Sequence, residues 1–129
     1  RLRGHADNFV ELVSTVLGAY RAGRTPSDMA SIMVGRAEEL GCADFVVPGC
    51  EHGIGLFGDE WRIGGRIEGP FPYWTDPDHE YAAGELLICA MQYAAPDEGV
   101  GFRYENPILL SGEGCEPLSK YPLAIEEIA

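Results

Sequence analysis

The chain has 129 residues, of which 46% are hydrophobic, 10% aromatic and 23% charged. This composition is typical of one globular domain over residues 1–129 with its own core, and it excludes a disordered chain. Nine basic residues against 21 acidic ones give a formal net charge of −12. Nucleic acid and anionic membrane surfaces are poor partners for such a chain, because binding them needs clustered Lys and Arg. A cationic substrate or a divalent metal suits the charge, although solubility alone explains it.

The start of the chain and its cysteines bear on its location. No apolar run approaches the roughly 20 residues that cross a bilayer, and no signal peptide precedes the first polar segment. The chain begins with Arg1, so we expect a trimmed chain or a piece of a longer protein. The cysteines at 42, 50, 89 and 115 lack Cys-x-x-Cys spacing, which argues against a structural zinc. Reduced cysteines and a cytoplasmic location follow.

Hydrophobic periodicity predicts two helices in the first third of the chain. Residues 6–22 carry an apolar stripe at helical spacing, and a glycine follows. A second helix begins after Thr25, with Pro26 at its first position, and ends at Gly41. Its buried face is predicted to consist of Met29, Ile32, Met33, Ala37 and Leu40. The short connection predicts an antiparallel helical hairpin that packs against a sheet.

The middle of the chain alternates short apolar pieces with glycine and proline. Residues 45–47 read as an extended piece, after which Pro48 and Gly49 turn the chain. Residues 57–84 contain so many glycines and prolines that we expect an irregular loop. Its aromatic residues could wall a pocket, or simply pack the loop onto the core.

Strands dominate the last third. The apolar run 86–93 predicts a buried strand, with Cys89 as a buried thiol, and residues 97–99 form a turn. Two further strands, 100–105 and 107–110, are expected on either side of Asn106. A hairpin turn at 111–114 leads to a returning strand at 115–118, and residues 121–129 form a tail with room for one helical turn.

One histidine stands in an unusual frame of glycines. His52 is followed by Gly53-Ile54-Gly55, which lets backbone come close to whatever the imidazole faces. This is how a metal ligand or an acid–base group is often presented. The alternative is a histidine that satisfies a backbone carbonyl inside a turn. His5 and His79 lie in polar contexts, where we expect exposed, incidental side chains.

The order of the motifs resembles the C-terminal half of the pita-bread family, which includes methionine aminopeptidases, Xaa-Pro aminopeptidases, prolidases, creatinases and a dimethylsulfoniopropionate lyase. That family shows a helix pair, Gly-His-Gly-x-Gly, a strand that carries a glutamate, then Arg-x-Glu and a Gly-Cys-Glu-x-Leu-like hairpin. This chain has the corresponding segments at 51–56, 83–90, 103–105 and 114–118. The resemblance implies an α+β fold, a curved antiparallel sheet with a two-helix layer. The site would lie in a cleft shared with an N-terminal half.

The resemblance also implies roles for individual residues. His52 matches the family's imidazole metal ligand, and Glu105 matches a bridging carboxylate ligand; with them, divalent metals such as Mn, Co or Zn would activate a water. Asp59 falls where the peptidases carry a second histidine that contacts substrate. Three further residues are implied in substrate binding: Glu60, Trp61 and Arg103.

The departures from the family concern the metal. Ala90 stands where the family's strand carries a ligand glutamate, and its methyl group cannot bind a metal. Glu85 precedes it on the same strand, too far along to substitute without a change of register. The pair Asp76 and Asp78 lies in a proline-rich loop, a poor setting for strand-borne ligands. The family's two ligand aspartates belong to the N-terminal half. We therefore expect a divalent metal only in a complete assembly, and the alternative is that the protein uses no cofactor.

Three functions remain open. The first is a hydrolase of C–N bonds in a peptide or small molecule, either prolidase-like or, without metal, creatinase-like with His52 as acid and base. The second is a non-catalytic binding or scaffold subunit that could use the aromatic loop at 57–84. Independently of function, Glu105 could merely pair with Arg103 or cap a bulge. The third is a lyase for a small zwitterion, based on Asp59, Glu60 and Trp61. Each requires a partner, either the missing N-terminal half or another subunit in a homo- or hetero-oligomer.

Overall fold

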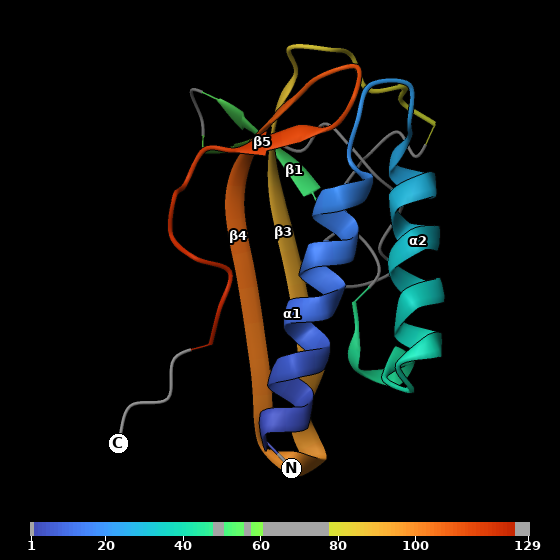
Figure 1. The fold of residues 1–129 in the computed structure, drawn as a ribbon, viewed down its shortest axis with the longest axis vertical. Helices are drawn as coiled ribbons and strands as arrows, with labels where there is room; N and C mark the ends of the chain where they lie inside the picture. The colour runs from blue at the N-terminus through green and yellow to red at the C-terminus, as the bar shows by residue number, and fades with distance from the viewer. Residues whose placement is uncertain (1, 48–50, 56–57, 61–77, 126–129) are drawn as a thin grey trace.

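Two antiparallel helices cover one face of an antiparallel sheet in a computed structural model of the chain (Figure 1). The structure describes residues 2–47, 51–55, 58–60 and 78–125, and for residues 54, 55 and 58–60 the backbone alone. The α+β architecture with a two-helix layer, predicted from the sequence, is confirmed. Whether residues 1–129 make up a whole domain stays a prediction.

The helices are α1, Leu2–Ala19, and α2, Pro26–Glu39. α1 ends earlier than the predicted residue 22 because the next N–H groups bond outside the helix: Ala22 N–H donates to Ser111 O and Gly23 N–H to Tyr81 O, both at 2.9 Å. α2 begins with a complete capping box, in which the Thr25 hydroxyl accepts from Asp28 N–H and the Asp28 carboxylate accepts from Thr25 N–H.

A five-stranded sheet has the order β2-β1-β3-β4-β5. Its strands are β1, Glu51–Gly55; β2, Gly58–Glu60; β3, Leu86–Ala95; β4, Val100–Leu110; and β5, Cys115–Pro117. A short 3-10 turn, Pro96–Glu98, joins the two long strands, and Gly99 closes it with φ of 68°. The predicted turns at 97–99 and 111–114 are confirmed.

Several predicted boundaries are wrong. β4 is one continuous strand and not two, although Pro107 lies inside it. The Pro107 carbonyl accepts from Leu118 N–H at 2.8 Å, so the missing N–H of the proline lies on that side and the ladder with β3 stays intact. The expected extended piece at 45–47 begins instead as the 3-10 turn Ala43–Phe45, and only Val46 bridges to β3. The described part of the tail, 121–125, contains no helical turn.

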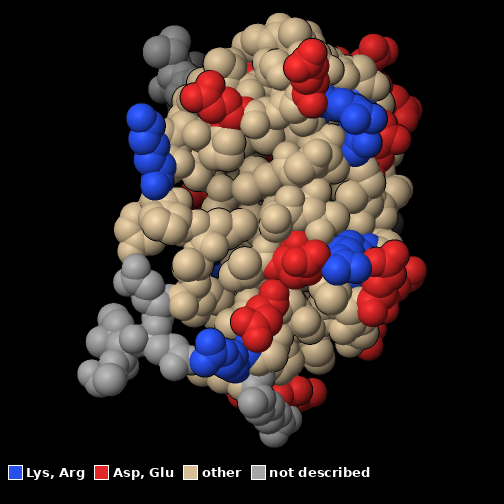
Figure 2. All heavy atoms as spheres, in the orientation of Figure 1, with Lys and Arg blue, Asp and Glu red and all other residues tan. Residues whose placement is uncertain are grey.

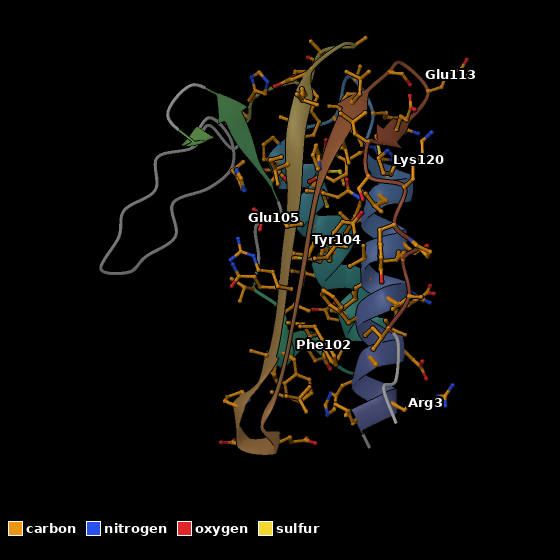
Figure 3. All side chains as sticks on the ribbon, turned by 90° about the vertical axis from the view of Figure 1, so that its left-hand side faces the viewer. Arg3, Phe102, Tyr104, Glu105, Glu113 and Lys120 are labelled. Atoms are coloured by element: carbon orange, nitrogen blue, oxygen red, sulfur yellow. The ribbon has the colours of Figure 1, made fainter. Side chains whose placement is uncertain are left out.

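Strand alternation divides the sheet into two faces. The core lies between the sheet and the helices, where α1 contributes Phe9, Leu12, Val13 and Val16, α2 contributes Met29, Met33 and Ala37, and β3 and β4 contribute Leu87, Cys89, Met91, Tyr93, Ile108 and Leu110. Figure 3 shows Phe102 and Tyr104 on this helix side and Glu105 on the opposite side of β4. We call the side away from the helices the outer face; Ala90, Arg103 and Glu105 lie on it.

His5 is not the exposed, incidental residue that the sequence predicted. Its Nδ1 lies 2.7 Å from the Tyr93 hydroxyl and its Nε2 lies 3.0 Å from Glu98 Oε2. The ring also contacts Phe45 and Tyr93 edge-on. These contacts join the first turns of α1 to the end of the β3–β4 hairpin, which explains why α1 begins earlier than residue 6.

Replacing Tyr93 with phenylalanine will lower the free energy of unfolding by about 1–3 kcal/mol, because a part-buried hydrogen bond to His5 is lost while the ring remains. Urea denaturation of the chain measures the change. Tyr121→Phe is the matched control, since Tyr121 is 71% exposed. Equal stability of Tyr93→Phe and wild type would show that the His5 contact contributes nothing to folding.

Charge is spread over the helix side of the molecule. Figure 2 shows Asp and Glu side chains there, with Lys and Arg among them. One cluster is Arg36 with Glu11 at 2.9 Å and Glu39 at 2.6 Å, all at the surface. Exposed pairs of this kind add little stability. In the described part of the chain, no helix is long and apolar enough to cross a membrane.

Candidate functional site

Three neighbouring strands bring the candidate site residues together on the outer face. β1 pairs with β3 so that His52 lies opposite Ile88, and β3 pairs with β4 so that Ala90 lies opposite Glu105. Ala90 is therefore on the middle strand, with the histidine strand on one side and the glutamate strand on the other. The three positions thus lie on three adjacent strands of one sheet.

His52 and Glu105 touch across the middle strand. The imidazole Nε2 lies 3.1 Å from Glu105 Oε1. Their strands are not neighbours, and two strand spacings of about 4.8 Å separate them, so the side chains must meet above β3. They can do so because Ala90, on the strand between them, ends at a methyl group; a long side chain at this position would fill the gap.

Both ring nitrogens of His52 face oxygen atoms. Nδ1 lies 2.9 Å from the Gly53 carbonyl oxygen, while Nε2 faces the Glu105 carboxylate. Both partners are oxygen atoms able to accept a hydrogen bond, so each ring nitrogen has an acceptor within reach. His52 is 5% exposed, so the two acceptors take the place of water. The backbone contact expected of a structural histidine is thus present together with the contact to Glu105.

Glu105 contacts both His52 and Arg103. Arg103 Nη2 lies 2.9 Å from Glu105 Oε2, on the oxygen that does not face His52. The Arg103 side chain is 57% exposed and that of Glu105 is 40% exposed, so water reaches this side of the pair. The contact with Arg103 predicted as an alternative role of Glu105 exists alongside the contact with His52. The carboxylate is therefore held at both oxygens at the edge of the site.

The described residues do not fit a metal by themselves. They contain no group of three or more His, Cys, Asp or Glu side chains able to hold an ion. Ala90 supplies no donor atom, and the His52 Nε2 position is directed at a carboxylate. Glu85 does not replace the missing ligand, because its carboxylate binds His79 Nε2 at 3.0 Å and Ala82 N–H at 2.9 Å. Two donors alone do not hold a dinuclear centre.

The remaining predicted site residues are only partly described. β2 carries Asp59 and Glu60, and its register places Glu60 opposite Gly53, beside the histidine. Their side chains lie outside the described residues, as do Trp61 and Asp76. Their predicted roles in substrate binding stay predictions.

Sequence reasoning missed the environment of Glu51. This residue precedes His52 and points to the opposite face, where it pairs with buried Cys89. The hydroxyls of Tyr20 and Tyr81 both donate to its carboxylate. Burial, with the Glu51 charge added, raises the pKa of the Cys89 thiol well above its usual range, so this thiol is unreactive. The signal in the sequence was the alternation of a charged residue with His52 on a short strand.

Comparison with solved structures identifies the fold. The X-Pro aminopeptidase from Thermotoga maritima aligns with a TM-score of 0.72 at 24% identity, covering 96% of this chain and 32% of that one. The prolidase from Pyrococcus furiosus aligns at 0.73 and 21% identity, covering 93% and 33%. A dipeptidase from Mycobacterium ulcerans aligns at 0.74 and 17% identity, covering 96% and 30%.

The chain resembles these proteins in structure, while its sequence is only distantly similar to theirs. No protein-family model matches the sequence, and no curated protein matches it in a sequence comparison. The chain spans about a third of the length of the three structures. The expected resemblance is confirmed at the level of fold: the chain has the α+β architecture of the C-terminal half of a pita-bread protein.

Proposed function

We propose that this chain is the C-terminal half of a pita-bread hydrolase that cleaves a C–N bond without a metal of its own. The observation that carries the proposal is the direct contact of His52 with Glu105 above Ala90. It is supported by the solved structures of X-Pro peptidases and dipeptidases that share the fold. This corresponds to the creatinase-like reading of the sequence, in which the histidine is the acid and base.

The proposal gives each residue a role that its position supports. In the proposed reaction the substrate displaces Glu105 from His52 Nε2, and the protonated ring passes its Nε2 proton to the leaving nitrogen as the C–N bond breaks. An attacking water forms the new C–O bond. The proton that the water releases returns to the imidazole, so the group ends the cycle as it began. Glu105 balances the positive charge of the ring and orients it, and Arg103 fixes the carboxylate from the outside. A cationic amide or amidine substrate suits the net charge of −12.

The site also needs a partner. Leu86 and Leu109 pair across β3 and β4 on the outer face and are 41% and 38% exposed. An apolar pair on an open sheet face beside the site favours an occupant that covers it. We propose the N-terminal half as this occupant, either as an upstream part of the same polypeptide or as another subunit, because the similar structures extend far beyond the aligned region.

Hydrolysis by the assembled protein will survive removal of metal. The experiment purifies the chain together with its N-terminal half and measures cleavage of Xaa-Pro dipeptides and small amidines before and after treatment with a chelator. We expect turnover to change less than about twofold, because general acid–base chemistry at His52 needs no ion. Loss of turnover on chelation, with recovery on addition of Mn, Co or Zn, would contradict the proposal and identify a metallohydrolase.

A second candidate function is a binding or scaffold subunit without catalysis. Ala90 favours it, because a side chain without a donor atom occupies the position where the family carries a ligand. The same purified assembly separates the two functions. A stable complex with the N-terminal half that hydrolyses none of the substrates, with or without metal, favours the scaffold.

A further inference from the structure

Glu51 is held from the helix side of the sheet by two buried tyrosines. The Tyr20 hydroxyl donates to Glu51 Oε2 at 2.5 Å, and the Tyr81 hydroxyl donates to Glu51 Oε1 at 2.8 Å. The tyrosines are 0% and 2% exposed, and their rings pack 5.9 Å apart. Both oxygens of the carboxylate therefore accept from hydroxyls whose rings are fixed in the core. Hydrogen bonds to an ionised acceptor are the stronger kind.

The two tyrosines are themselves anchored by backbone contacts. Tyr20 directly follows α1, and its N–H donates to Val16 O at 3.2 Å. Tyr81 N–H donates to Arg24 O and Tyr81 O accepts from Gly23 N–H, both at 2.9 Å. The carboxylate of Glu51 thus ties β1 to the end of α1 and to the segment that leads into β3.

An anchor of this kind matters for β1 because its ladder with the long strand β3 is short. Only two of its residues, Glu51 and His52, pair with β3. On its other side β1 pairs, among the described residues, with the three-residue strand β2, Gly58–Glu60. Gly53 and Gly55 add conformational freedom and no packing side chain. Neighbouring side chains of a strand point to opposite faces of the sheet. Holding the Glu51 side chain on the helix side therefore holds the β1 backbone from which the His52 side chain projects on the outer face.

The contact of His52 with Glu105 leaves little tolerance. It spans the width of β3 and measures 3.1 Å. A movement of β1 by about half an ångström would lengthen it beyond an effective hydrogen bond. The imidazole therefore depends on the placement of a strand that pairs with β3 at only two residues.

We propose that Glu51, bound by Tyr20 and Tyr81, is a positioning residue that sets the His52 imidazole against Glu105. An effect of Glu51 on catalysis rests on the proposed function, because it presupposes that His52 is the acid–base group. The geometry it concerns is present in the chain itself and can be measured without turnover. A carboxylate with a purely structural role would support folding and leave the His52 ring unaffected.

Nitrogen-15 NMR of the histidine rings tests the proposal, at a pH where the His52 imidazole carries both protons. The readout is the exchange rate of the Nε2 proton with water in Tyr20→Phe/Tyr81→Phe, Glu51→Ala and Glu51→Gln. We expect the first two to raise this rate roughly tenfold, because the ring loses its fixed acceptor. Glu51→Gln should recover most of the protection, since its amide still bonds both hydroxyls.

Tyr93→Phe is the matched control. It also removes a buried tyrosine hydroxyl bond, but its partner is His5 at the other end of the hairpin. Unchanged His52 exchange in the folded Tyr20→Phe/Tyr81→Phe chain, or an equal rise in Tyr93→Phe, would overturn the proposal. If Glu51→Ala does not fold, the tyrosine variants carry the test. The two proposals can fail separately. If the assembly shows no turnover but the exchange rate of the His52 ring proton still depends on Glu51, the hydrolase is rejected and the positioning role of Glu51 stands.

Discussion

Replacing His52 with alanine will lower kcat/KM of the assembled protein by about 10²- to 10⁴-fold, the usual contribution of a positioned acid–base group. The variant loses the only described side chain that reaches Glu105 from β1, since Glu51 points to the other face. Folding should survive, because the partner carboxylate is 40% exposed and Arg103 still pairs with it. Steady-state kinetics of the assembly with the N-terminal half measure the loss.

Two further variants make this result specific. Glu105→Gln should cost less than His52→Ala, because Glu105 orients the ring and does not itself transfer the proton. His79→Ala should leave kcat/KM unchanged, since His79 binds Glu85 away from the His52 contact. Full turnover in folded His52→Ala would place the acid–base chemistry elsewhere and remove the basis of the proposed function.

The layers of the fold could be predicted from local patterns. The apolar stripe of α2 and its Thr25 cap were both readable, because helix periodicity and capping depend on neighbouring residues only. The end of α1 was not, since Ala22 and Gly23 bond to segments far along the chain. The prediction of two strands around Pro107, where the structure has the single strand β4, was wrong for a similar reason. Which side of β4 its missing N–H faces is settled by the pairing with β3 and Leu118, and not by the residue itself.

The candidate site was likewise predictable only in part. Resemblance to the pita-bread family located His52 and Glu105 and marked Ala90 as a departure. The direct contact between the two was not predictable, because it depends on the registers of three strands and on the space above a methyl group. The role of Glu51 was hidden because Tyr20 and Tyr81 are distant in sequence and meet it only after the helices pack on the sheet. Local sequence patterns do not predict contacts between the helix layer and the sheet.

The described site residues lack the donors to hold a metal ion, and Ala90→Glu should create a site that binds a divalent metal. The substitution places a carboxylate on the middle strand, opposite Glu105 and beside His52, so that three neighbouring strands each supply a donor. Without metal, the added charge faces Glu105 and displaces its contact with the imidazole. We expect this to lower the free energy of unfolding by about 1–2 kcal/mol.

Metal should reverse that loss in the variant and do nothing for wild type. At about one hundred times its dissociation constant, Zn or Mn bound only to the folded variant would stabilise it by about 2.7 kcal/mol. Thermal unfolding with and without metal measures the shift. Ala94→Glu is the matched control, because Ala94 lies on the same face of β3 but opposite Gly101, away from both donors. Stabilisation of wild type by the same ions would show that Ala90 is no obstacle, whereas a variant indifferent to metal would mean that the matched position does not point into the site.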